Sequence, residues 1–188
     1  MKSFFAVLGM LLSLWTYGQS QVQDNAALLK MILTKYYANE KPVVKNRLQL
    51  LFFYSEKANN TVEISEGCKA HPVLKNFYAE IKKQIQIENQ QENWNAEFQL
   101  LFTNQHEYLQ TKVQTPVSLE KFQALNQSFG ENNQRMLIVN KPIYLPNNYC
   151  LIKIGFYRSI EHNSGSFVLF QKINGVWQWI EEFNRWET

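Results

Sequence analysis

The pair Asn174-Gly175 constrains the fold of this chain more than any other feature, because it separates two segments that alternate like β-strands. Asn and Gly tolerate the positive φ angles of a type I′ turn, and an Asn-Gly pair in this setting is the strongest short-range signal for a β-hairpin. Pairing Ile173 with Val176 across the turn sets the register of the two strands. We therefore expect the chain to fold around an antiparallel hairpin over residues 166–186.

This register predicts that both faces of the hairpin are apolar. The residues predicted on one face are Val168, Phe170, Trp177, Trp179 and Phe183, and those on the other are Phe167, Leu169, Ile173, Val176 and Ile180. A sheet that is half exposed to water has one polar face, so both sides of this hairpin should be covered.

Two explanations fit the apolar faces. Helices could cover one side while an N-terminal hairpin, an edge loop or a dimer partner covers the other, since aromatic stripes usually belong to a core. Alternatively, the aromatic face lines a groove for a ligand or partner, because exposed apolar patches often mark such sites. The binding residues would then be Trp177, Trp179, Phe170, Tyr157 and His162, the last two at the rim.

Upstream of residue 135 the hydrophobic pattern is mainly helical. Apolar residues recur with helical spacing after Asp24, after Pro72 and from Trp94 towards Pro116. A shorter stripe follows Ser118, which, like Asp24, can cap a helix N-terminus. We therefore predict four helices in this part of the chain.

The remaining segments predict strands. Leu48–Tyr54 and Thr61–Ser65 are rich in residues that favour strands and are predicted to form a short hairpin. Four further strands are predicted over residues 136–145, 149–158, 166–173 and 176–186. Together these patterns predict a single α+β domain over residues 19–188, with N-terminal helices and a short hairpin followed by a C-terminal four-stranded antiparallel meander.

Residues 1–18 have the three parts of a secretory signal peptide: Lys2, an apolar run from Phe4 to Trp15, and a small residue, Gly18. A helix of twelve residues is only about 18 Å long, against a hydrocarbon core of about 30 Å. We expect cleavage after Gly18 or after Ser20. The product would be periplasmic or secreted, and we expect no membrane span in the mature chain.

Charge and motifs exclude several classes of function. The chain has 19 basic and 16 acidic residues. Removing Lys2 with the signal leaves 18 basic residues, and these are scattered along the chain, so we expect no nucleic-acid partner. The sequence contains no nucleophile elbow, phosphate loop or dinucleotide fingerprint, and its three histidines lack zinc-site spacing. No catalytic residue, cofactor or metal is therefore assigned.

Asn and Gln together number 36, which exceeds the 35 charged residues. Amides solvate a surface without adding net charge, and their donors and acceptors also suit sugar hydroxyls. A compositional habit of the genome explains the same excess, because the amides show no clustering along the sequence.

Cys68 and Cys150 are the only cysteines, and export makes a disulfide between them chemically accessible. Such a bond would close a loop of 83 residues, from 68 to 150 inclusive. The alternative is that Cys150 is a small core residue, since it alternates with Ile152, Ile154 and Phe156 in a predicted strand.

Three C-terminal stretches carry a resemblance to a known group of proteins: Asn140–Tyr144, Tyr149–Tyr157 and Leu169–Trp177. They resemble the Pro-apolar-aromatic strand, the Tyr-led strand and the Lys-x-Asn-Gly-x-Trp hairpin of uncharacterised exported bacterial proteins. The resemblance covers about a quarter of the chain (the Gly-rich loop of that group is replaced here by residues 159–165) and implies export but no activity. The order of elements and the final Gly-x-Trp hairpin are also similar to the cone-shaped fold of the nuclear transport factor family.

The leading hypothesis is therefore a non-catalytic, exported binding or structural protein of the bacterial cell envelope, with a protein or glycan partner. One alternative is a hydrolase-like or isomerase-like enzyme with a pocket in a cone-shaped fold. A deep pocket with a buried acid or base would support this alternative. The other is a carbohydrate-binding module, which requires flat, exposed Trp rings flanked by amides.

Overall fold

The computed structural model describes residues 21–38, 43–44, 47–48, 50–87, 91–103, 113, 116–128, 134–159 and 161–188. The predicted signal peptide at residues 1–18 lies outside the described residues. So does His106, one of the three histidines.

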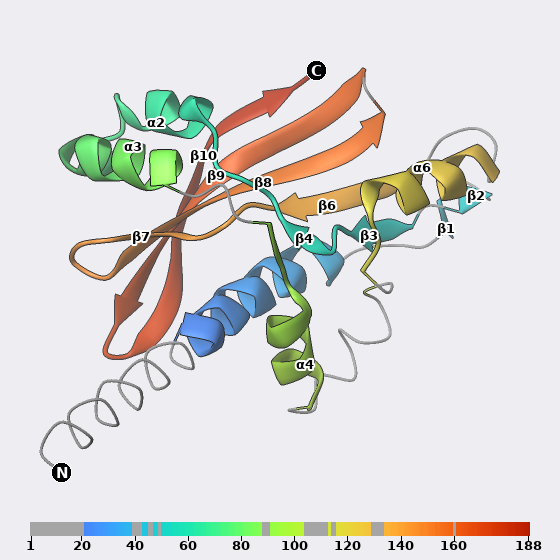
Figure 1. Ribbon diagram of the computed structural model, residues 1–188, viewed down its shortest axis with the longest axis horizontal. Helices are drawn as coiled ribbons and strands as arrows, with labels where there is room; N and C mark the ends of the chain where they lie inside the picture. Colours follow the sequence, from blue (N-terminus) through green and yellow to red (C-terminus); the bar gives the residue numbers. More distant parts are fainter. Residues whose placement is uncertain are drawn as a thin grey trace, which may run out of the picture.

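A six-stranded mixed sheet forms the centre of the fold (Figure 1). Its strands are β3 (Leu51–Phe53), β6 (Arg135–Val139), β7 (Ile143–Leu145), β8 (Tyr149–Ser159), β9 (His162–Ile173) and β10 (Val176–Glu187). The strand order is β10-β9-β8-β6-β3, and β7 also pairs with β8. All neighbours are antiparallel except β3, which runs parallel to β6. With helices on the sheet, the fold is α+β, as predicted.

The predicted four-stranded meander is not quite what forms. Residues 136–145 were expected as one strand but make two, β6 and β7, and both pair with β8. The break falls at Asn140-Lys141-Pro142, where Pro142 has no backbone N–H to contribute to a ladder. In addition, β3 joins the sheet through a parallel pairing that local alternation does not reveal.

The predicted hairpin of Leu48–Tyr54 with Thr61–Ser65 is wrong. Residues 62–68 form the helix α2 (Val62–Cys68), which buries Ile64 and Cys68 on one side. The adjacent residue Ser65 is buried as well. One helical face can bury residues i, i+1 and i+4 together, whereas a strand would point Ile64 and Ser65 to opposite faces. Two short pairs of strands complete the β-structure: β1 (Val43–Val44) with β2 (Arg47–Leu48), and β4 (Glu56–Lys57) with β5 (Glu92–Asn93).

The four predicted helices are present, although the first is already helical at residues 21–23, so Asp24 is not its N-cap, and residues 104–112 of the third lie outside the described residues. They are the helix over residues 21–37, α3 (Tyr78–Ile87) preceded by the 3₁₀ turn η1 (Leu74–Phe77), α4 (Asn95–Thr103) and α6 (Leu119–Ser128). The hydroxyl of Ser118 accepts a hydrogen bond from the backbone N–H of Lys121 at 3.3 Å, which is the N-cap expected for α6.

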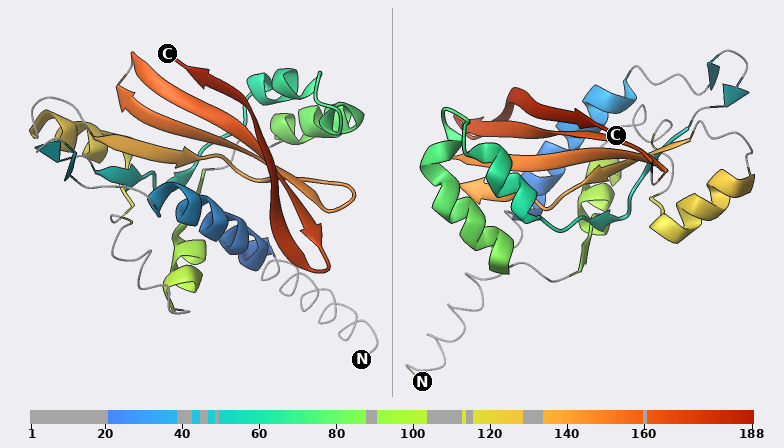
Figure 2. Two further views of the ribbon diagram at one scale, coloured as in Figure 1. Left: turned by 180° about the vertical axis from the view of Figure 1, so that it is seen from behind. Right: turned by 90° about the horizontal axis from the view of Figure 1, so that it is seen from above.

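Both faces of the sheet are covered by helices. On one face Leu29 and Leu33 of the helix over 21–37 belong to the same core cluster as Ile154 and Phe170. On the other face α2, η1 and α3 pack on Phe167 and neighbouring side chains, while α6 packs on β6. In all views α2 and α3 lie at one end of the sheet and α6 at the other (Figures 1 and 2).

The register of the last hairpin follows the prediction only as far as Trp179. Val176 pairs with Ile173 and Trp179 with Phe170, and Asn174 and Gly175 have the positive φ angles of 50° and 80° expected for the turn. Beyond Trp179 the register shifts twice, each shift adding one residue to β10.

The first shift moves Phe183 to the opposite face from the one predicted. Its ring lies 5.7 Å from that of Phe167, between centroids, instead of beside Trp177. The second shift contains Asn184, whose φ is 50°. Because a β-bulge inserts an unpaired residue, simple alternation mispredicts every side chain beyond it.

Candidate functional site

Three of the five predicted binding residues lie under the helix over residues 21–37. Phe170 is fully buried and Trp177 is only 8 % exposed. The indole N–H of Trp177 donates to Oδ1 of Asp24 at 2.9 Å. The half-buried Trp179 packs edge-on against Phe170, and Nζ of Lys35 lies 3.8 Å from the centre of its ring. This geometry favours the covering explanation for these three residues.

The other two predicted residues, Tyr157 and His162, lie away from the tryptophans, near the end of β8 and the start of β9. His162 is exposed and lines a small polar hollow with Arg135 and Arg158. Tyr157 lines a larger pocket on the opposite face. The structure thus separates the predicted set into a buried group and two surface positions.

Cys68 and Cys150 are both buried and are not bonded to each other. Cys68 packs with α3, whereas Cys150 packs with the helix over 21–37, so the sheet stands between the two sulfurs. Burial raises the pKa of the Cys68 thiol to about 12 and the pKa of Cys150 well above its ordinary value. Both side chains serve as small core residues.

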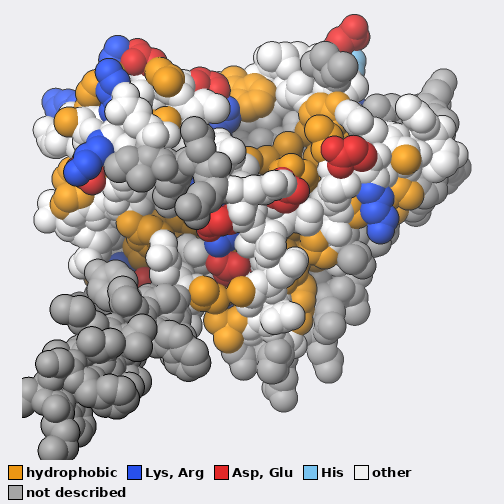
Figure 3. Space-filling view, in the orientation of Figure 1, with side chains coloured by type: hydrophobic (Ala, Val, Ile, Leu, Met, Phe, Trp, Pro, Cys, Tyr) orange, Lys and Arg blue, Asp and Glu red, His pale blue; other side chains and the backbone are white. Residues whose placement is uncertain are grey.

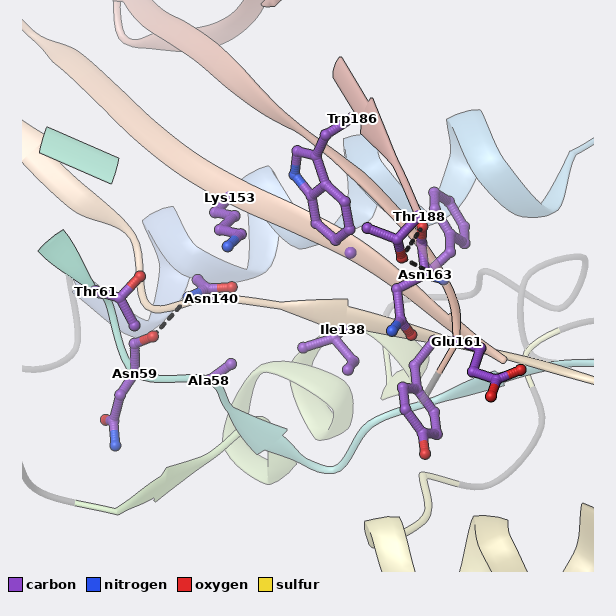
Figure 4. A pocket seen from close by; sticks show the side chains of 13 residues that line it. Ala58, Asn59, Thr61, Ile138, Asn140, Lys153, Glu161, Asn163, Trp186 and Thr188 are labelled. Atoms are coloured by element: carbon purple, nitrogen blue, oxygen red, sulfur yellow. Dashed lines mark hydrogen bonds between the residues drawn. The ribbon is translucent and has the colours of Figure 1, made fainter. Parts of the chain in front are cut away.

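A pocket of about 510 Å³ opens on the face of the sheet that carries α2 and α6. The space-filling view shows the hollow with hydrophobic side chains at its border (Figure 3). In the close view, Trp186, Asn163 and Thr188 stand on one side of the pocket, and Ala58, Asn59 and Thr61 stand on the other (Figure 4).

The floor of the pocket follows from one cross-strand row. Ile138 pairs with Gly155, Gly155 with Gly165, and Gly165 with Trp186, so these residues point to the same face of the sheet. Gly155 has no side chain, and a Cβ atom built there would meet its nearest neighbours only at 3.8 and 4.0 Å. The pocket therefore exists because Gly155 leaves the middle of the row empty.

The second glycine of the row holds Trp186 in place. A Cβ atom at Gly165 would lie 2.5 Å from Cζ2 of Trp186 and 2.5 Å from the backbone oxygen of Ile154. The indole therefore packs directly against the backbone, which only a glycine permits. The bulge at Asn184 brings Trp186 into this row, since without it the alternation would differ by one residue.

The rows on either side supply the polar groups. Tyr157 pairs with Asn163, whose backbone carbonyl accepts the N–H of Thr188. On the other side, the N–H of Asn140 donates to the carbonyl of Lys153 at 3.0 Å, and the Asn140 side chain donates to the Asn59 carbonyl at 2.7 Å. Amide and hydroxyl groups thus lie on opposite sides of the open floor.

Charges in the pocket largely cancel. Nζ of Lys153 lies 2.6 Å from Oε2 of Glu63 and 5.4 Å from the centre of the Trp186 ring. Glu161 is exposed at the rim. No histidine is among the described lining residues, and Glu161 carries the single carboxylate side chain there. The described lining thus combines a paired lysine, an exposed glutamate, aromatic rings and amides.

A buried carboxylate, that of Glu97 in α4, lies outside the pocket. Glu97 is 1 % exposed, and its Oε1 accepts from Nδ2 of Asn25 at 2.9 Å and lies 2.8 Å from Nζ of Lys57. Nζ of the buried Lys141 lies 3.3 Å from Glu92, which also contacts Lys57. These groups neutralise one another and connect elements, which is a structural role.

The described residues contain no group of three or more His, Cys, Asp or Glu side chains that could hold a metal ion. Nor does this part of the chain contain a helix with the length and hydrophobicity needed to cross a bilayer.

Sequence reasoning missed the residues that make the pocket, above all Gly155, Gly165 and Trp186. The available signal was Gly155 inside the predicted strand 149–158, since an interior strand glycine often marks a close approach of another group. Gly165 was predicted to lie in the loop over residues 159–165 instead. Register would have been needed to place the two side by side.

No protein-family model matches the chain, and no curated protein or solved structure matches it either. Function is therefore inferred from the chemistry of the pocket itself.

Proposed function

We propose that this chain is an exported, non-catalytic binding protein of the bacterial cell envelope, and that its ligand occupies the pocket between Gly155 and Trp186. The observation that carries the proposal is the row in which Gly155 leaves the floor open beside a half-buried indole held against Gly165. Export rests on residues 1–18, and the bacterial envelope on the resemblance of the C-terminal strands.

The ligand should be uncharged, with one flat apolar face and several hydroxyl or amide groups. Trp186 and Tyr157 offer rings for the apolar face. Asn140, Asn163 and Thr188 offer donors and acceptors at the edges. A strongly charged ligand is disfavoured because Lys153 is already paired with Glu63.

The proposal is tested by filling the pocket. Gly155→Val places two methyl groups on the open floor, and Trp186→Ala removes the ring that borders it. Both variants should lose binding of a soluble digest of bacterial cell walls, measured by tryptophan fluorescence for Gly155→Val and by calorimetry for both. Val62→Ala is a matched control, because Val62 is 62 % exposed and does not line the pocket.

Circular dichroism and a thermal melt establish that each variant is folded. If the wild-type protein binds no component of the digest, or if folded Gly155→Val binds as tightly as the wild type, the pocket is not the binding site.

A further inference from the structure

A second hollow, of about 500 Å³, adjoins the pocket. Tyr157 and Glu161 line both. The second hollow continues from Tyr157 along α6, where Gln123, Asn126 and Gln127 form its wall. The two hollows therefore make one groove, which starts at Trp186 and passes Tyr157 to reach α6.

Tyr157 is held as a rigid divider between the two hollows. Its ring packs edge-on against the buried Phe122, with 5.9 Å between centroids, and its hydroxyl lies 3.5 Å from Nε2 of Gln123. A ring supported in this way offers an apolar contact at little entropic cost, because its side chain is already ordered.

The two rings lie at separate positions along the groove. Trp186 lies on β10 and Tyr157 on β8, two strands away and one row along the sheet. With strands about 4.8 Å apart and about 3.4 Å per residue, their Cα atoms are about 12 Å apart. A ligand that extends from Trp186 past Tyr157 to α6 must therefore contain more than one ring-sized unit.

The polar lining of the groove consists mostly of amides. Six amide side chains line it: Asn59, Asn140, Asn163, Gln123, Asn126 and Gln127. Its charges occur with both signs, since Arg158 and Glu161 both line the second hollow. Neutral amides beside aromatic rings match a ligand whose repeating units carry hydroxyl groups around an apolar ring face.

We propose that the groove binds a neutral oligosaccharide, with one sugar unit beside Trp186 and further units crossing Tyr157 along α6. This inference rests on the proposed function and adds to it the class of ligand and its direction. It assigns Gln123 and Gln127, which lie outside the pocket, to the recognition of the further units.

The experiment compares ligand lengths by calorimetry. The probes are the monomer, dimer, tetramer and hexamer of three neutral β-1,4-linked series: N-acetylglucosamine, glucose and mannose. For at least one series we expect the tetramer to bind at least tenfold more tightly than the monomer. Gln127→Ala should reduce the tetramer affinity towards that of the monomer and leave the monomer affinity unchanged, because Gln127 lines only the second hollow.

Lys121→Ala is the control on α6, since Lys121 is exposed and lines neither hollow. Equal affinity for monomer and hexamer would overturn the proposal of an extended groove but would leave the proposed binding at the pocket unaffected. If the cell-wall digest binds but no glycan series does, or if a wall peptide is what binds, the oligosaccharide is overturned and the proposed binding function stands. If Gly155→Val binds the tetramer normally, the proposed function itself fails.

Discussion

At the scale of single residues, the site depends on two glycines that face the same way on neighbouring strands but serve opposite purposes. Gly155 leaves space, and Gly165 permits contact. Neither has the positive φ that would itself require glycine, so their roles come from the surroundings of the missing Cβ atom. Replacing each glycine by the same residue should therefore have different effects on stability.

We predict that Gly155→Ala and Gly165→Ala differ sharply in stability. At Gly155 an added methyl group meets only ordinary contacts, and the loss of unfolded-state freedom makes the change neutral or stabilising by up to about 1 kcal/mol. At Gly165 the methyl group meets a backbone oxygen and the Trp186 ring at 2.5 Å, so a loss of about 1–3 kcal/mol is expected.

Urea denaturation of both variants measures the difference, and near-ultraviolet circular dichroism reports whether Trp186 moves. Equal free energies of unfolding for the two variants would show that the indole does not pack on the backbone as described.

At the scale of elements, Glu97 of α4 joins parts of the chain that local sequence does not connect. Its Oε1 is shared by Asn25 of the helix over 21–37 and Lys57 of β4. The hydroxyl of Tyr144 in β7 in turn donates to Oδ1 of Asn25 at 2.7 Å. The network holds the N-terminal helix and α4 together beside the sheet.

We predict that Glu97→Leu lowers the free energy of unfolding by about 3 kcal/mol, because the buried ammonium group of Lys57 then keeps only its 3.3 Å contact with the exposed Glu92. The double variant Lys57→Met/Glu97→Leu should recover most of that loss, since removing both charges removes the burial penalty. Chemical denaturation of both variants and of Lys57→Met forms a double-mutant cycle. Additive losses in that cycle would mean that the two side chains do not interact.

Several elements could be predicted from local pattern, and others could not. The four helices, the turn at Asn174-Gly175 and the pairing of Ile173 with Val176 depend on contacts close in sequence, and they are confirmed. The strand predicted at Thr61–Ser65 is a helix because packing of Ile64 and Cys68 on α3 overrides strand propensity. The face of Phe183 was mispredicted because a bulge leaves no reliable mark in the sequence.

At the scale of the whole molecule, the two helical layers bury several weakly acidic groups. Burial raises the pKa of Tyr36 and of Tyr54 to about 12, with the carboxylates of Glu182 and Glu56 adding to the respective shifts. Burial alone raises the pKa of Cys68 to about 12. The folded protein therefore keeps these protons at pH values where the unfolded chain begins to lose them.

We predict that this burial makes the protein sensitive to alkali. A group whose pKa is higher in the folded state stabilises the fold fully below its unfolded pKa, which is about 8.5 for Cys and about 10 for Tyr. That contribution is lost as the pH rises towards 12. The free energy of unfolding in urea should therefore be steady from pH 7 to 8 and fall steadily between pH 9 and 11.5.

Tyr36→Phe should flatten the part of this fall above pH 10, and Cys68→Ala the part above pH 9. An unfolding free energy that stays constant up to pH 11.5 would contradict the burial of these groups.

The sequence by itself determined the class of fold, the helices and the C-terminal turn, because turn chemistry and hydrophobic period act within a few residues. It also indicated that both faces of the last hairpin are covered. Only the tertiary structure decided which residues form the pocket and the groove. Cross-strand register set Gly155 beside Gly165, two bulges carried Trp186 onto them, and the fold gathered six amides that lie scattered along the chain into one groove. Such placement depends on pairings between distant segments, which local pattern does not encode.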